Sequence, residues 1–290
     1  MNPAGIRILE AVLLAALSLW LAAPPAGAHS GIHRRIEHAT ETIERQPKAA
    51  RGYISRAYLH TEHQDWAAAL DDIRQAERLA GNPALTDFPH ARVLWQQYRE
   101  TGQKEALDKA LLYINRHVQA SPSDARGRLL RARIFQARGK AQQALQDYEA
   151  ALAHTDRPQT DLFLETARLW QQQGHPDRAL AVLEDCLKRT GTAPVPVSRL
   201  ALEIAMKNHQ PKVALEWWER LPPVLRQLPD ELLTRGDLLA HTGNGQAARE
   251  AWCEAKRRYE QMPSWRRQKP NLKTFPRQLE SRLQQSCKPS

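Results

Sequence analysis

Apolar residues recur along the chain with helical spacing, and a short theme centred on a small residue returns at a longer period. The central alanines of this theme are 34 to 38 residues apart. They are Ala69, Ala106, Ala144, Ala179, Ala214 and Ala248. A polar or glycine pair precedes each alanine and predicts a turn: Gln64-Asp65, Gly102-Gln103, Gly139-Lys140, Gly174-His175, His209-Gln210 and Gly243-Asn244.

This spacing predicts pairs of helices of about a dozen residues joined by tight turns. Small residues also occur twelve positions before the alanines, as at Ala57, Ala132 and Gly236, where two helix backbones would approach closely. One such pair cannot bury its apolar face alone, so successive pairs stack. The pattern therefore predicts an all-α protein built as a solenoid.

The repeated unit resembles the tetratricopeptide repeat, a 34-residue helix-turn-helix. Residues 230–255 hold the clearest copy, with Gly236, Gly243, Ala248 and Trp252 at the family's positions. The resemblance extends over roughly residues 47–262 and implies a right-handed superhelix (an α-solenoid) of about six repeats. The second copy is degenerate, with a longer second helix from about Lys104 to Val118.

The two ends of the solenoid are expected to carry capping helices. Residues 29–47 place Ile32, Ile36 and Ile43 on one helical face. Residues 263–290 form a basic linker followed by a helix that can begin at Pro276. The repeats themselves are assigned to residues 48–262. Capping helices are expected on either side of them because a stack of repeats needs a polar outer face at each end.

Residues 1–28 have the pattern of a secretory signal peptide. An apolar run over residues 11–23 is followed by Pro24-Pro25 and then by Ala26-Gly27-Ala28, which favours cleavage after Ala28. The mature chain would begin at His29 and would be periplasmic or secreted, by export of the Gram-negative type. An uncleaved anchor is the alternative, because only Arg7 supplies a base before the apolar run.

Export would place three cysteines in an oxidising compartment. Cys253 and Cys287 are the pair proposed to bridge, since Cys287 lies on a tail that can fold back. Cys186 is interpreted as a small buried hydrophobic residue.

The net charge of +10 comes largely from one stretch near the C-terminus. Residues 256–277 contain eight bases and one acid, interleaved with Tyr259, Trp265 and Phe275. Export disfavours nucleic acid as a partner and favours an anionic envelope surface or an acidic partner. The candidates for that contact are Arg257, Arg258, Trp265, Arg266 and Arg267. The alternative is an extended solvated linker, with Trp265 and Phe275 packed on the last repeat.

Catalytic motifs are missing from the sequence. It has no His-Glu-x-x-His, no glycine-rich phosphate loop, no Gly-x-Ser-x-Gly and no Cys-x-x-Cys. The chain is therefore not expected to be an enzyme or to need a cofactor.

Histidines near the predicted mature N-terminus suggest one metal-handling alternative. A terminal amine and its own imidazole can chelate copper together, which His29 would allow. His33 lies one helical turn away, and His60 and His63 lie near the first predicted turn. The same four histidines can instead be solvated polar residues.

The resemblance implies a concave groove lined by the first helix of each repeat. Two of the family's groove positions are occupied by Arg51, Tyr58, Arg126, Arg133 and Arg168. Arginines of this kind can hold carboxylates bidentately, so the expected partner is a peptide or a protein. The alternative is a solvated face paired with Glu62 or Glu165. The family's Lys and Asn clamp for chaperone tails is absent.

Overall fold

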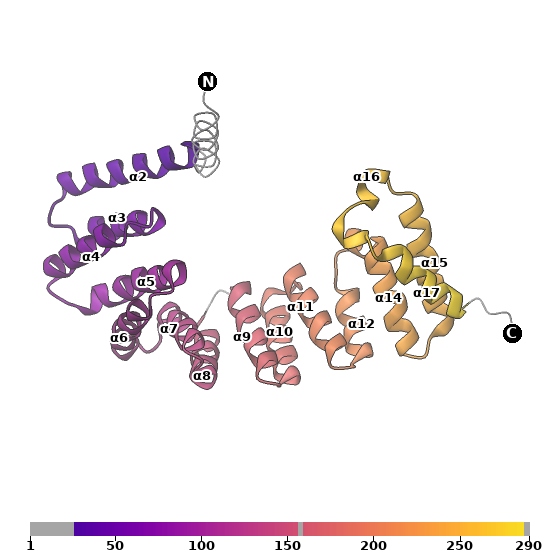
Figure 1. Ribbon diagram of the computed structural model, residues 1–290. Helices are drawn as coiled ribbons and strands as arrows, with labels where there is room; N and C mark the ends of the chain where they lie inside the picture. The colour runs from indigo at the N-terminus through magenta and orange to yellow at the C-terminus, as the bar shows by residue number, and fades with distance from the viewer. Residues whose placement is uncertain (1–25, 156–158, 287–290) are drawn as a thin grey trace, which may run out of the picture. The chain divides into compact units, whose positions relative to one another are not determined.

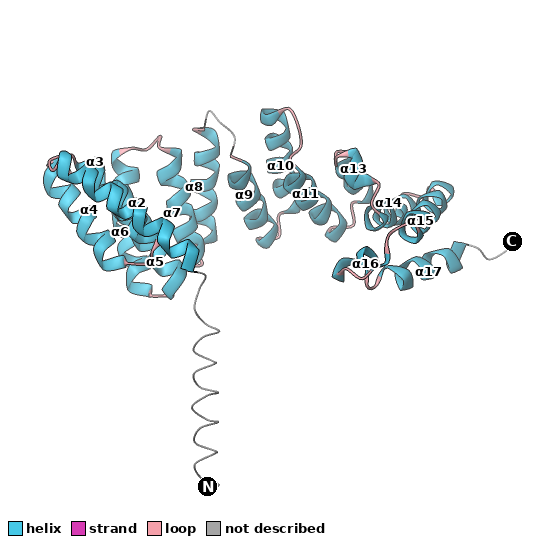
Figure 2. Ribbon diagram, turned by 90° about the horizontal axis from the view of Figure 1, so that it is seen from above, coloured by secondary structure: helices cyan, strands magenta, loops and turns pink. Residues whose placement is uncertain are grey.

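The computed structural model describes residues 26–155 and 159–286, and every regular element in these ranges is a helix (Figures 1 and 2). The chain divides between Ile134 and Phe135 into two compact units. The first unit contains α2 (Ala26–Arg45), α3 (Ala50–Glu62), α4 (Trp66–Ala80), α5 (Ala84–Thr101), α6 (Lys104–Ala120) and most of α7 (Ala125–Ala137).

The second unit begins at the end of α7 and runs to the C-terminus. It contains α8 (Ala141–Ala153), α9 (Thr160–Gln172), α10 (Pro176–Thr190), α11 (Val195–Lys207), α12 (Pro211–Glu219), α13 (Pro223–Arg226), α14 (Pro229–His241), α15 (Gly245–Glu260), α16 (Ser264–Arg267), the 3-10 turn η1 (Pro270–Leu272) and α17 (Phe275–Ser286). The predicted helical fold is confirmed, with six helix pairs running from α3/α4 to α14/α15. The short helices α13, α16 and η1 were not predicted.

The same backbone conformation closes the turn within every pair. The first residue of each predicted turn has a positive φ, from 54° at His209 to 85° at Gly243. Glycine adopts this left-handed region without a steric penalty, and four of the six turns use it. Gln64 and His209 adopt it with side chains, so the turn geometry is kept even where glycine is missing.

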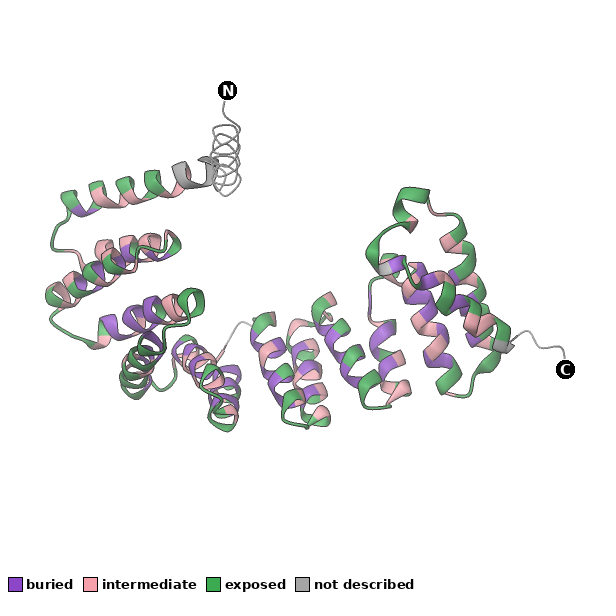
Figure 3. Ribbon diagram, in the orientation of Figure 1, coloured by how far each residue is buried: buried purple, intermediate pink, exposed green. Residues whose placement is uncertain are grey.

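Small residues bring the paired helices into close contact. Ala57, Ala69, Ala132 and Ala167 are completely buried, and the buried positions face neighbouring helices (Figure 3). Gly236 is the closest case, because a Cβ placed there would lie 2.3 Å from the indole of Trp252. The predicted periodicity of small residues therefore reflects direct packing of backbone against side chain.

Capping helices cover the described ends of the stack. Ile43 of α2 is buried at the start of the chain. At the other end Leu272, Phe275 and Leu279 join the hydrophobic cluster formed by α14 and α15. A bidentate ion pair closes the same seam, with Arg282 Nε and Nη2 each 3.1 Å from a carboxylate oxygen of Asp237.

Some predictions concern residues that the structure describes only in part. Residues 1–25, which hold almost all of the predicted signal peptide, lie outside the described range. Cys287, near the other end of the chain, also lies outside it. Cys186 is fully buried, as interpreted from sequence, and Cys253 is exposed. In the described ranges, no helix combines the length and the apolar character that a membrane crossing requires.

The buried imidazole of His90 on α5 predicts a dependence of stability on pH. Its ring stacks on Tyr113 of α6 with centroids 4.3 Å apart, and its Nδ1 has no hydrogen-bond partner among the described residues. Burial lowers the pKa of His90 below its ordinary value. As pH falls through about 6.5 the unfolded chain therefore takes up the proton first, and the first unit loses stability.

The variant His90→Phe retains a stacking ring without a titrating group. Urea unfolding between about pH 7.5 and about pH 5.5 should show a smaller loss of stability for this variant than for the wild type. Equal losses in both proteins would contradict the assignment to His90.

Candidate functional site

A groove of about 1500 Å³ lies in the first unit between α2 and α3. One wall is the exposed face of α2, and the opposite wall is one face of α3, with a contribution from α5. The lining side chains central to its chemistry are Arg34, Arg35, His38, Arg51, Tyr58, Glu62 and Arg92. All of them belong to the first unit, so this groove is defined without reference to the second.

The helical period explains why α3 presents these residues together. Arg51, Ser55, Tyr58 and Glu62 are spaced by three or four residues and line the groove, which places them on one stripe of the helix. Ala57 lies on the opposite side and is buried against the core cluster of α3 and α4. The same helix therefore packs with one face and offers the other to the groove.

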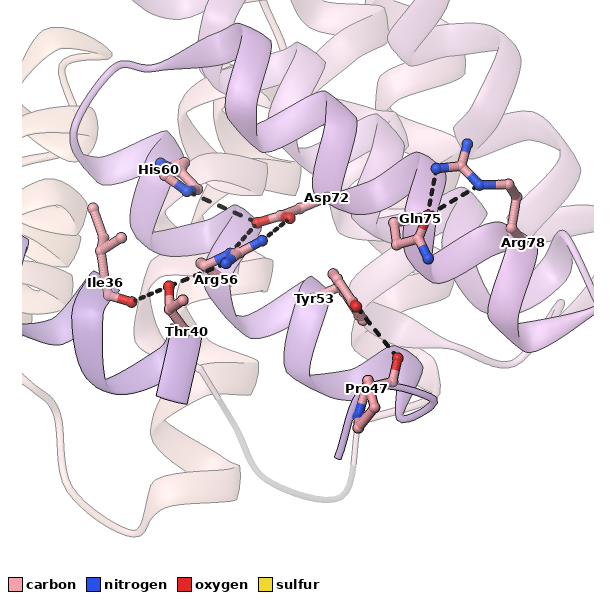
Figure 4. Close-up of polar contacts among 9 residues, drawn as sticks. All are labelled: Ile36, Thr40, Pro47, Tyr53, Arg56, His60, Asp72, Gln75 and Arg78. Atoms are coloured by element: carbon pink, nitrogen blue, oxygen red, sulfur yellow. Dashed lines mark hydrogen bonds and ion pairs between the residues drawn. The ribbon is translucent and has the colours of Figure 1, made fainter. Parts of the chain in front are cut away.

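A buried polar cluster holds the α3 wall in place (Figure 4). Arg56 donates to both carboxylate oxygens of Asp72 on α4, at 2.9 and 2.7 Å. Its remaining Nη1 donates to Thr40 Oγ1 on α2, at 3.0 Å. Hydrogen bonding with Asp72 raises the pKa of Arg56 above its ordinary value, so the guanidinium stays charged. One side chain thus joins the cap helix to the first repeat pair.

Four arginines and three glutamates line the groove, and the glutamates are Glu37, Glu41 and Glu62, so a small excess of positive charge remains. Arg35 pairs with Glu62 at 2.8 Å, and Glu41 lies near His38 and Arg45. Arg51 and Arg92 have no carboxylate within ion-pair distance among the described residues. These two guanidinium groups are therefore available to an added anion.

Tyr58 provides a half-buried aromatic surface beside these charges. The Arg92 guanidinium carbon lies 4.2 Å from the centroid of its ring. Burial raises the pKa of Tyr58, and the positive charges of Arg92 and Arg126 oppose the shift. Tyr58, Arg92 and Arg126 thus form one electrostatic neighbourhood across α3, α5 and α7.

Solved structures share this arrangement of helix pairs. The C-terminal part of a TPR repeat-containing protein from Cytophaga hutchinsonii aligns with a TM-score of 0.57 over 81% of this chain and 93% of that chain, at 15% identity. The chain has a tetratricopeptide-repeat fold. No protein-family model matches its sequence, and no curated protein does.

Two further solved structures are similar in fold. PilW, described as a widely conserved type IV pilus biogenesis factor, aligns with a TM-score of 0.50 at 19% identity, over 78% of this chain and 98% of that chain. The protein pilF of Pseudomonas aeruginosa aligns with a TM-score of 0.52 at 16% identity, over 74% and 94%. Identities this low establish the fold and leave the partner open.

The structure brings together three of the five predicted groove residues of the tetratricopeptide repeats. Arg51 and Tyr58 line the groove, and Arg126 lies close enough to influence Tyr58 electrostatically. Arg133 is half-buried and already engaged. Arg168 is exposed and lies in the second unit.

Arg92 is the residue that sequence reasoning missed. It lies in the degenerate second repeat, at another of the positions that the family directs toward the groove. Only two of these positions were considered from sequence, and in this repeat they are occupied by Phe88 and Trp95. The position of Arg92 within the repeat indicates the groove, but the irregular length of this repeat makes that position hard to recognise.

Two acids on first helices of repeats in the second unit are engaged in internal contacts. Asp237 accepts hydrogen bonds from Trp252 Nε1 at 3.1 Å and from Arg282 of the cap. Glu203 is 2.6 Å from Lys207 Nζ one helical turn away. These carboxylates of the second unit therefore serve packing and local pairing.

The histidines predicted as a metal alternative are only partly assembled. His33 and His63 come into edge contact with ring centroids 4.7 Å apart, and His60 Nε2 lies 3.9 Å from Asp72. The His29 side chain is outside the described residues. Within the described residues, no three His, Cys, Asp or Glu side chains gather as a metal site.

Two of the predicted anionic-surface residues are engaged in ion pairs. Arg258 Nε lies 2.7 Å from Glu254, and Arg257 bonds to the same carboxylate. Phe275 is buried as expected for a packed linker, but Trp265 is 65% exposed, so its predicted packing is wrong. The linker also contains α16 and η1 and is not simply extended.

Proposed function

We propose that the chain is an exported scaffold whose groove between α2 and α3 binds a carboxylate-bearing peptide segment of a partner protein. The observation that carries this proposal is the pair of uncompensated arginines, Arg51 and Arg92, beside the half-buried ring of Tyr58. Guanidinium groups bind carboxylates through paired, charge-assisted hydrogen bonds. The aromatic face of Tyr58 and the apolar groove positions next to it would contact the peptide side chain that neighbours the bound carboxylate.

The tetratricopeptide-repeat fold supports a role in protein interaction. A stack of helix pairs presents an extended surface on rigid elements. The groove lies on such elements, because Arg56 and Asp72 fix α2, α3 and α4 against one another. A preformed surface loses less conformational entropy when a peptide binds.

Export is part of the same proposal and is supported by the pattern of residues 1–28. N-terminal sequencing of the chain recovered from cell fractions tests it, with His29 expected as the first residue. An intact N-terminus in the cytoplasmic fraction would reject export without affecting the groove.

A peptide array can test the groove directly. We expect the wild-type chain to bind a subset of a random peptide library displayed with free C-terminal carboxylates and acidic residues. The variant Arg51→Gln/Arg92→Gln should lose about tenfold or more in affinity, since charge-assisted hydrogen bonds are worth about 1.5–3 kcal/mol each.

The matched control is Arg74→Gln on α4, which removes an exposed arginine already paired with Asp71. This control should bind like the wild type. If the double variant keeps the wild-type peptide set and affinities, peptide recognition does not occur at this groove.

A further inference from the structure

A basic segment follows α15 and contains no acid between Glu260 and Glu280. We name residues 261–279 the basic strap. Its bases are Arg266, Arg267, Lys269, Lys273 and Arg277. None of them has a carboxylate within ion-pair distance among the described residues, unlike the neighbouring Arg257 and Arg258.

The basic strap is held against the second unit by its apolar residues. Leu272, Phe275 and Leu279 are at most 5% exposed and belong to the cluster beneath α17. The ring of Tyr259, at the end of α15, stacks on Phe275 with centroids 4.8 Å apart. Two of the three interleaved aromatics therefore point inward and anchor the strap.

The third aromatic, Trp265 on α16, points outward. It is 65% exposed, whereas the six other tryptophans in the described ranges are buried or half-buried. Lys269 Nζ lies 5.9 Å from the centroid of its ring. The anchored strap thus presents one large amphipathic side chain, and its five bases all follow Trp265 in the sequence.

We propose that the basic strap docks the protein on an anionic membrane surface. Trp265 would enter the headgroup region, where indole rings are favoured because one part is apolar and another can donate a hydrogen bond. The free bases would meet the anionic headgroups around it.

A lipid surface fits these residues better than an acidic protein does. The bases are distributed along a segment of short helices and turns. A plane of phosphates needs charge and an interfacial aromatic, whereas a stable protein interface also needs an extended complementary core. Exposed apolar area in the strap is concentrated in one side chain.

Vesicle flotation with the full chain tests this proposal. Binding is expected to vesicles that contain phosphatidylglycerol, and not to phosphatidylcholine alone, and it should weaken as salt rises. The variant Arg266→Gln/Lys269→Gln/Lys273→Gln should lose roughly 100-fold in partitioning, at about fivefold for each base near the surface. The variant Trp265→Ala should also weaken vesicle binding, and the binding that remains should depend on salt as it does in the wild type.

A variant with the same net charge provides the control. Arg45→Gln/Arg74→Gln/Arg78→Gln removes three exposed arginines of the first unit that already contact Glu41, Asp71 and Gln75. It should keep wild-type vesicle binding, and circular dichroism should report equal helix content in all variants.

Three results would overturn the proposal. They are an equal loss of vesicle binding in the control and strap variants, no binding of the wild type to anionic vesicles at low salt, or loss of polyglutamate binding in the strap variant with vesicle binding unchanged. The last result would identify the basic strap as a site for acidic protein segments.

Discussion

Replacing Arg56 with Met is expected to lower the free energy of unfolding of the first unit by about 3 kcal/mol. The change removes both hydrogen bonds to Asp72, which is only 6% exposed, and the bond to Thr40 on the cap helix. Asp72 would then keep a buried carboxylate without its main partner. Urea unfolding together with amide hydrogen exchange over α2–α4 measures the loss.

Two companion variants separate this effect from a general loss of charge. Arg35→Met breaks the exposed Arg35–Glu62 pair of the same helix contact and should cost less than about 1 kcal/mol. Adding Asp72→Leu to Arg56→Met should recover most of the stability, because an apolar pair can replace a buried ion pair. If both single variants lose the same stability, the polar cluster does not hold the cap.

Replacing Gly236 with Ala should destabilise the second unit by about 2 kcal/mol. Helix propensity alone favours alanine by about 1 kcal/mol. The new Cβ, however, would lie 2.3 Å from the Trp252 ring, and overpacking of this kind costs about 1–3 kcal/mol. Moving the indole also breaks its hydrogen bond to Asp237, which adds about 1 kcal/mol.

The control for this substitution is Gly245→Ala in the first turn of α15. Among the described residues, no atom beyond the adjoining residues and the local helix backbone lies within 4 Å of a Cβ built at Gly245, so the variant should be neutral or slightly more stable than the wild type. Thermal or urea unfolding followed by far-ultraviolet circular dichroism compares the two. A Gly236→Ala protein as stable as Gly245→Ala would show that Trp252 relaxes without cost.

The repeated elements of the fold were predictable from sequence because the two helices of each repeat pack against each other in the same way. Turn residues and small interior residues both leave signals at fixed spacing. Even Gln64 and His209 were placed in turns by their position, although neither is glycine. The insertions α13, α16 and η1 break the period, so no repeat pattern could predict them.

The groove was predictable only in part, because the partner of a charged side chain depends on helices that are distant in sequence. Arg51 and Tyr58 occupy groove positions that the resemblance to the tetratricopeptide repeat implies. The pairing of Arg282 with Asp237 spans 45 residues and requires knowing where α17 packs. The repeat period also does not predict that Trp265 is exposed while Phe275 is buried.

The seam between α14, α15 and α17 has a consequence for how long the stack can be. A repeat array has no intrinsic end, because each helix pair leaves an apolar face on which the next pair can pack. Here the final pair meets Leu272, Phe275 and Leu279, and Arg282 neutralises Asp237 at the edge of the same face. Among the described residues, these contacts cover the face of the last pair on which a further repeat would pack. The C-terminal segment thus takes the place of a further repeat.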